Sequence, residues 1–115
     1  MATVTEVVDR AANDLGILRL GQTLQAQDST RITEAYNEVY ATLVNEGLAT
    51  WASTAEVPDE LVPHVVALMA DNCINVYGLS KERYQRIKGA SIPALREIRR
   101  LTAPIYVSQD SAANY

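Results

Sequence analysis

The chain has 115 residues, a formal net charge of −4, an apolar share of 48% and one cysteine. This length predicts a single domain, and one cysteine excludes an internal disulfide. No apolar run approaches the roughly 18 residues that a transmembrane helix needs. The first residues also lack the basic start and apolar core of a signal peptide. We therefore expect a protein that is made in a cytoplasm and contacts no membrane.

The first predicted element is a helix over residues 4–15. Thr3 and Glu6 have the spacing of a capping box at its start. Gly16 follows the last apolar position and is a candidate for a left-handed residue that ends the helix. One apolar stripe at helical spacing is formed by Val4, Val7, Val8, Ala11, Ala12 and Leu15.

A packed connector over residues 17–27 and a second helix over about 29–46 are predicted next. The connector is too apolar for a free loop, and Asp28 and Ser29 are both suitable N-caps for the helix. Trp51, just beyond the helix, is expected to fold back on the core. The predicted apolar stripe of this helix consists of Ile32, Tyr36, Val39, Tyr40, Leu43 and Val44.

The third predicted helix starts near Val57-Pro58-Asp59-Glu60 and runs from Leu61 to Gly78. Between Val65 and Ile74 it is apolar on nearly every side, which predicts the central helix of a bundle or one that a neighbouring subunit covers. Cys73 falls in this stretch and is expected to be a buried structural thiol.

The fourth predicted helix covers residues 81–101, with Ser80 as its cap. Pro93 removes one backbone hydrogen bond, so a kink is expected near residues 89–92. The apolar positions of this helix are Tyr84, Ile87, Ile92, Leu95, Ile98 and Leu101.

After residue 101 the helical pattern stops. The sequence therefore predicts an all-α fold, a small four-helix bundle over residues 1–101 with an extended C-terminal arm over 102–115. The arm has too little apolar surface to order itself alone, yet its stretch Ile105-Tyr106-Val107 is too apolar for an inert tail. An arm that docks on another protein fits this composition better.

Charge is distributed unevenly along the chain. Residues 1–80 hold eleven acidic side chains and three basic ones, whereas residues 81–101 hold seven basic side chains against two acidic ones. The seven basic residues are Lys81, Arg83, Arg86, Lys88, Arg96, Arg99 and Arg100. Three interpretations of this basic helix stay open: a solvated face, a contact with the acidic flank of another copy, and a contact with DNA phosphate.

No motif in the sequence points to catalysis. His64 is the only histidine, so the usual zinc clusters are excluded, and it lies beside Val65 with no sequence signal of a dyad. The five glycines are scattered and form no phosphate-binding loop. We therefore expect no enzymatic activity, no cofactor and no metal.

The order of these segments resembles that of the head-to-tail adaptors of tailed phages, which are also called head-completion or packaged-DNA-stabilising neck proteins. The resemblance rests on the Leu15-Gly16 turn, the segment from Gly47-Leu48 to Trp51, the buried helix that ends in Tyr77-Gly78, and the basic helix and arm after it. It covers about residues 4–101 in organisation. The chain is shorter than several adaptors of short-tailed phages.

The resemblance implies a structural protein of the virion neck, made in the host cytoplasm. Such adaptors form a ring of about twelve copies beneath the portal, extend and seal the DNA channel, and offer a platform to tail proteins. The implied partners are the portal protein, sister copies, tail or tail-hub proteins and, non-specifically, the packaged double-stranded DNA. The expected portal-binding residues of the arm are Pro104, Ile105, Tyr106, Val107 and Tyr115. The alternative is a small non-specific DNA-binding or packaging accessory protein that uses the basic helix 81–101.

Overall fold

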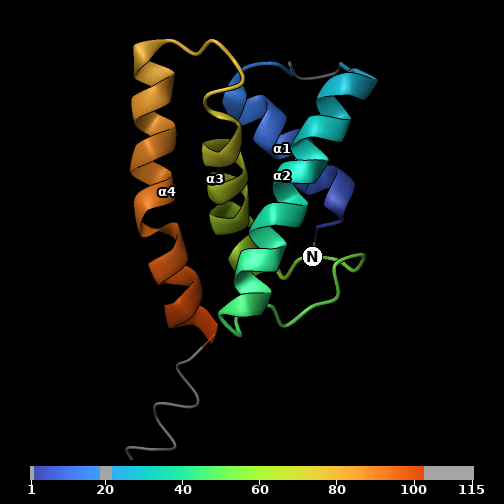
Figure 1. Ribbon diagram of the computed structural model, residues 1–115, viewed down its shortest axis with the longest axis vertical. Helices are drawn as coiled ribbons and strands as arrows, with labels where there is room; N and C mark the ends of the chain where they lie inside the picture. Colours follow the sequence, from blue (N-terminus) through green and yellow to red (C-terminus); the bar gives the residue numbers. More distant parts are fainter. Residues whose placement is uncertain (1, 19–21, 103–115) are drawn as a thin grey trace, which may run out of the picture.

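In a computed structural model, residues 2–18 and 22–102 are described, and they form an all-α bundle (Figure 1). The elements are α1 (Val4–Leu15), α2 (Ala26–Asn45), the short 3₁₀ helix η1 (Asp59–Leu61), α3 (Val62–Cys73) and α4 (Lys81–Thr102). The predicted fold class, a small four-helix bundle, is confirmed. The predicted arm lies outside the described residues, except for Thr102, which was assigned to the arm and instead belongs to the last turn of α4.

Helix α1 has the predicted bounds because both of its ends carry local signals. The Thr3 hydroxyl accepts a hydrogen bond from the Glu6 amide at 3.2 Å, which satisfies one of the free donors of the first turn. Gly16 is left-handed, with φ 81°, and the Ile17 amide donates to the Ala12 carbonyl at 3.1 Å. This arrangement satisfies the last carbonyls of the helix.

Helix α2 begins earlier than predicted. Gln25 is its N-cap, and neither Asp28 nor Ser29 acts as one, because both already lie inside the first turn. Alanine and glutamine at positions 26 and 27 favour helix, so the helix already begins at Ala26, before Asp28 and Ser29. The Asp28 carboxylate instead accepts the Tyr77 hydroxyl at 3.0 Å. At the other end, Val44 was predicted to be in the apolar stripe but is 53% exposed.

Helix α3 is shorter than predicted. It follows η1 and ends at Cys73 rather than near Gly78. Residues 74–76 form turns, with the Val76 amide donating to the Cys73 carbonyl at 3.0 Å. Asparagine, valine, tyrosine and glycine at positions 75–78 are poor helix formers, and the chain must reverse there to begin α4.

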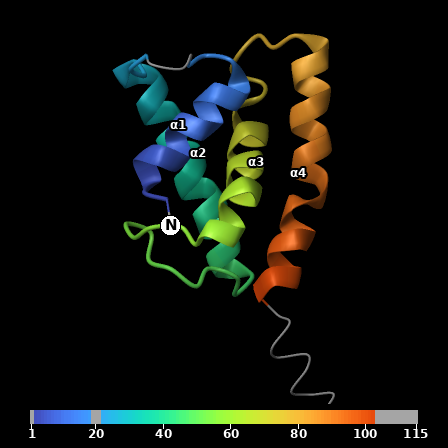
Figure 2. The ribbon, with the colours of Figure 1, turned by 180° about the vertical axis from the view of Figure 1, so that it is seen from behind.

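Helix α4 is continuous through Pro93. Its lower half runs in a different direction from its upper half in both ribbon views (Figures 1 and 2). The bend agrees with the predicted kink, because Pro93 has no N–H for the preceding turn. Ser80 caps the helix as predicted: its hydroxyl accepts from the Arg83 amide at 3.2 Å.

The core centres on α3, which packs against α1, α2 and α4. Met69 and Val65 of α3 are fully buried, and Cys73 is a buried free thiol, as predicted. Trp51 folds back on the core as expected, with its Nε1 donating to the Tyr36 hydroxyl at 3.0 Å. Over the described ranges, no helix combines the length and the apolar character that a membrane span requires.

Candidate interaction surface on the fourth helix

Helix α4 is attached to the bundle along one narrow face. Its buried residues are Ile87, Ser91, Ala94 and Ile98, which recur at helical spacing and face α3. Neither α1 nor α2 makes a comparably extensive contact with α4. The helix therefore stands beside α3 with a hollow on each of its flanks.

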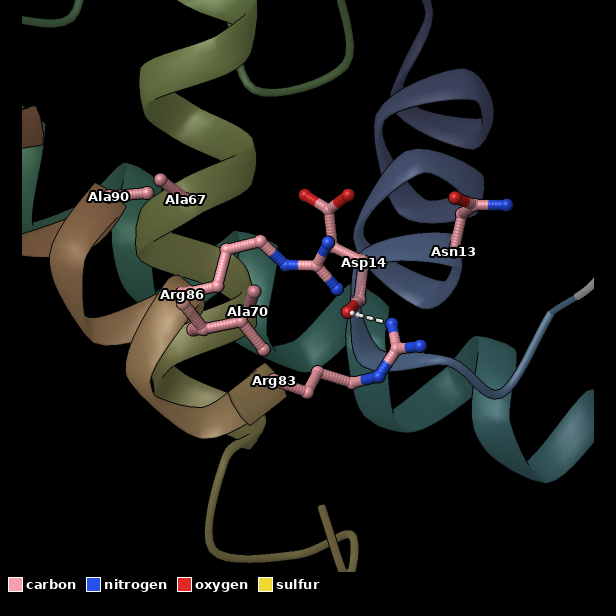
Figure 3. A pocket seen from close by; sticks show the side chains of 8 residues that line it. Asn13, Asp14, Ala67, Ala70, Arg83, Arg86 and Ala90 are labelled. Carbon is pink, nitrogen blue, oxygen red and sulfur yellow. Dashed lines mark hydrogen bonds between the residues drawn. The ribbon is translucent and has the colours of Figure 1, made fainter. Parts of the chain in front are cut away.

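The first hollow, about 190 Å³, lies between α1 and α4. Its floor contains Ala67 and Ala70 of α3, and its rim carries Asp14, Arg83 and Arg86 (Figure 3). The Arg83 guanidinium donates to the Asp14 backbone carbonyl at 2.8 Å. Because this carbonyl lies in the last turn of α1, the cation also meets the negative end of the helix dipole.

Arg83 explains why position 16 is a glycine. A Cβ atom at Gly16 would lie 2.9 Å from the Arg83 Cζ atom, closer than nonbonded carbon atoms approach. The left-handed backbone of Gly16 already disfavours any other residue. One glycine thus ends α1 and makes room for the side chain that ties α4 to it.

Asp14 is the titratable group of this hollow. Desolvation by burial raises the pKa of its carboxyl, while the charges of Arg86, Arg83 and Arg10 act in the opposite direction. The Arg86 side chain extends toward Asp14 (Figure 3). The Asp14 carboxylate thus lies near two guanidinium groups at the end of α1. This arrangement holds α4 against α1, and the negative charge of the carboxylate disfavours the binding of an anion.

The second hollow, about 290 Å³, lies between α2 and α4, and we call it the α2/α4 groove. It is mixed in character: Asp71 forms an ion pair with Lys88 at 2.8 Å, and Asn72 donates to Glu38 at 3.4 Å. The contact with Asp71 raises the pKa of Lys88. The lining consists of Glu38, Val39, Thr42, Leu68, Asp71, Asn72 and Leu95.

Beside this groove α4 exposes apolar side chains. Ile92 was predicted as part of the apolar stripe of the helix, but it is 74% exposed, and Tyr84 is 43% exposed. The residues that actually face α3 include Ser91 and Ala94, which the sequence interpretation missed. Small residues near Gly89 and Pro93 were the available signal, since a close helix contact needs small side chains.

The structure divides the seven predicted basic residues into two groups. Lys88 pairs with Asp71, Arg99 with Glu46 at the end of α2, and Arg100 with Glu97 of its own helix. Arg83 binds the end of α1. The other three, Lys81, Arg86 and Arg96, are exposed and form no hydrogen bond or ion pair with the described residues.

Lys88 and Arg99 thus pair with acidic residues of the body of the same chain, and Arg83 binds its backbone. None of the three interpretations drawn from the sequence included pairing within one chain. The five predicted arm residues, Pro104 to Val107 and Tyr115, lie outside the described residues.

Within residues 2–18 and 22–102, no group of histidine, cysteine and carboxylate side chains could hold a metal ion. No protein-family model, curated protein or solved structure matches the chain. The functional argument therefore rests on the surfaces of α4.

Proposed function

We propose that the chain is a non-enzymatic structural adaptor of a phage neck, which assembles as a ring of copies under a portal protein. The ring would extend and seal the DNA channel and present a platform to tail proteins. Support comes from the organisation of the sequence, which resembles that of head-to-tail adaptors, and from the surface of α4.

The observation that carries the proposal is the exposed flank of α4. Ile92 is three-quarters exposed beside the α2/α4 groove, and the cations of Lys81 and Arg96 lie on the same long helix. The exposed α2 residue Glu34 offers an opposite charge on a different face. A ring requires such heterologous contacts, in which one surface meets a different surface of the next copy.

Portal attachment through the arm is the testable part of the proposal. A chain that ends at residue 102 keeps every described buried residue, so we expect it to fold with an unchanged circular dichroism spectrum. It should fail to co-sediment with portal rings that retain the full chain. The double variant Ile105→Asp, Val107→Asp should fail in the same way, because it removes the apolar anchors. Unchanged attachment of both variants would show that the arm is not the portal-binding element.

A DNA-binding accessory protein is the second candidate. The observation that favours it is the set of exposed cations Lys81, Arg86 and Arg96, which form no hydrogen bond or ion pair with the described residues, although Arg86 lies near Asp14. Phosphate contacts from these three residues would be independent of base sequence. The salt dependence of DNA binding separates the two candidates, because its slope reports the number of phosphate contacts.

A further inference from the structure

We propose that the α2/α4 groove is the docking site of the chain's own C-terminal segment, residues 105–110. The inference concerns the free chain before any assembly. It does not rest on portal binding or on the ring, and its test contains neither.

The groove lies about two helical turns from the end of α4, since Leu95 is the α4 residue that lines it. Arg99, in the last turn of α4, forms an ion pair with Glu46 at the end of α2, so the ends of these helices lie together (Figure 1). The described chain ends at this corner, with Thr102 as the last residue of α4. A segment that starts there needs only one reversal of direction to run back between the two helices.

The length of the segment suits this path. At 1.5 Å per residue, Leu95 lies about 10 Å and Lys88 about 21 Å above the end of α4. If Ala103 and Pro104 form the reversal, an extended chain rising about 3.3 Å per residue brings Val107 about 10 Å up. Asp110 then lies about 20 Å up, at the level of Lys88.

The chemistry of the segment also matches the groove. Ile105 and Val107 lie on one face of an extended chain, and the groove offers them Leu68, Leu95 and Val39. Asp110 is the only charged side chain after residue 102. The cation nearest to its level is Lys88, which already pairs with Asp71 of the groove lining and could bind both carboxylates. An apolar pair followed by one carboxylate fits a groove that offers apolar side chains and, at the level of Asp71, the ammonium group of Lys88.

Docking in the same chain would cover the exposed apolar flank of α4 until a partner takes the arm. The arm would then be stored on the bundle in the free protein and released on assembly. While the arm lies in the groove, neither is available to another molecule. The arrangement therefore delays association of the chain with partners before assembly.

Amide NMR of the full chain tests the inference through the backbone order of residues 105–110. We expect order parameters near about 0.8 in the wild type, and a fall below about 0.6 when the arm is released. Thr42→Glu should release it, since Thr42 is exposed, lines the groove one turn from Glu46, and would place a carboxylate against the apolar pair Ile105 and Val107. Val44→Glu is the matched control: it is exposed on the same helix but outside the groove lining, so the order should persist.

The arm variant Ile105→Asp, Val107→Asp should shift the amide signals of Val39, Thr42 and Leu95 while leaving those around Val44 in place. Order parameters below about 0.6 in the wild-type arm would overturn the proposal. So would order that disappears on tenfold dilution together with a dimer mass in sedimentation, because the groove would then hold the arm of a second copy.

Discussion

Gly16 and Arg83 occupy one small space at the junction of α1 and α4. We expect Gly16→Ala to lower the free energy of unfolding by about 2 to 3 kcal/mol. Of this, about 1 to 2 kcal/mol comes from a left-handed non-glycine residue. A further contribution of about 1 kcal/mol comes from moving Arg83 off the Asp14 carbonyl. Urea denaturation of the two proteins measures the difference.

Gly47 provides the matched control for this prediction. It has φ 73°, but a Cβ atom there would meet nothing within 4 Å. Gly47→Ala should therefore show the backbone cost alone. In an Arg83→Ala background the two glycine substitutions should become equally costly. An equal cost in the wild-type background would mean that Arg83 makes no tight contact with Gly16.

Tyr77 links the turn after α3 to the first turn of α2. Burial, together with its hydrogen bond to Asp28, raises the pKa of Tyr77 to about 12. The unfolded chain releases this proton at its ordinary pKa near 10. The stabilising contribution is therefore complete below pH 10 and is lost as the pH rises from about 10 to about 12.

Tyr77→Phe should lower the free energy of unfolding by about 1 kcal/mol at neutral pH, because a hydrogen bond is lost. It should also flatten the decline in stability between about pH 10 and 12. Tyr84→Phe is the control, since Tyr84 is exposed and its hydroxyl bonds to none of the described residues. Thermal melts at several pH values would contradict the assignment if both variants behaved alike.

At the scale of elements, the ends of α1 were predictable because their signals are local. The Thr3 cap and the Gly16 turn each act within one helical turn of the helix end that they define. The start of α2 was missed because Asp28 is engaged by Tyr77, a residue far along the chain. The face of α4 was missed for a similar reason: Ser91 and Ala94 are buried by the close approach of α3, which periodicity alone does not reveal.

Pro93 is the residue that gives α4 its two directions. We expect Pro93→Ala to raise the free energy of unfolding by about 2 kcal/mol. Alanine restores a backbone donor for the Gly89 carbonyl and is about 3 kcal/mol more favourable than proline inside a helix. The freer unfolded chain offsets up to about 1 kcal/mol of this gain.

Ile92→Ala is the control for this substitution, because it trims an exposed neighbour without altering any backbone donor. Urea denaturation compares the variants, and hydrogen exchange of the α4 amides locates the change. A loss of stability in Pro93→Ala would mean that the bend is required to seat Ile98 against α3.

At the scale of the whole molecule, the contrast between an acidic body and a basic last helix was visible in the sequence. The sequence did not predict which charged side chains pair across the bundle. Lys88 reaches Asp71 and Arg99 reaches Glu46 only because α4 packs along α3 and ends beside α2. These contacts use part of the positive charge inside one chain, so fewer cations remain for an external partner.

This internal pairing limits DNA binding. Among the described basic residues of α4, only Lys81, Arg86 and Arg96 form neither a hydrogen bond nor an ion pair through their side chains. If they met three phosphates, the logarithm of the binding constant would fall with the logarithm of salt with a slope of about −2.7. We expect this shallow slope, and a dissociation constant no tighter than about 10⁻⁴ M near physiological salt. Fluorescence anisotropy with a labelled duplex measures both.

The triple variant Lys81→Gln, Arg86→Gln, Arg96→Gln should abolish even this weak binding, whereas Lys88→Gln should leave it unchanged because Lys88 is held by Asp71. A slope near −6 would require about seven phosphate contacts. The four engaged residues of α4, Lys88, Arg99, Arg100 and Arg83, would then have to leave their partners. Such a slope would favour a DNA-packaging accessory protein over a neck adaptor, because a channel wall must let DNA slide past it.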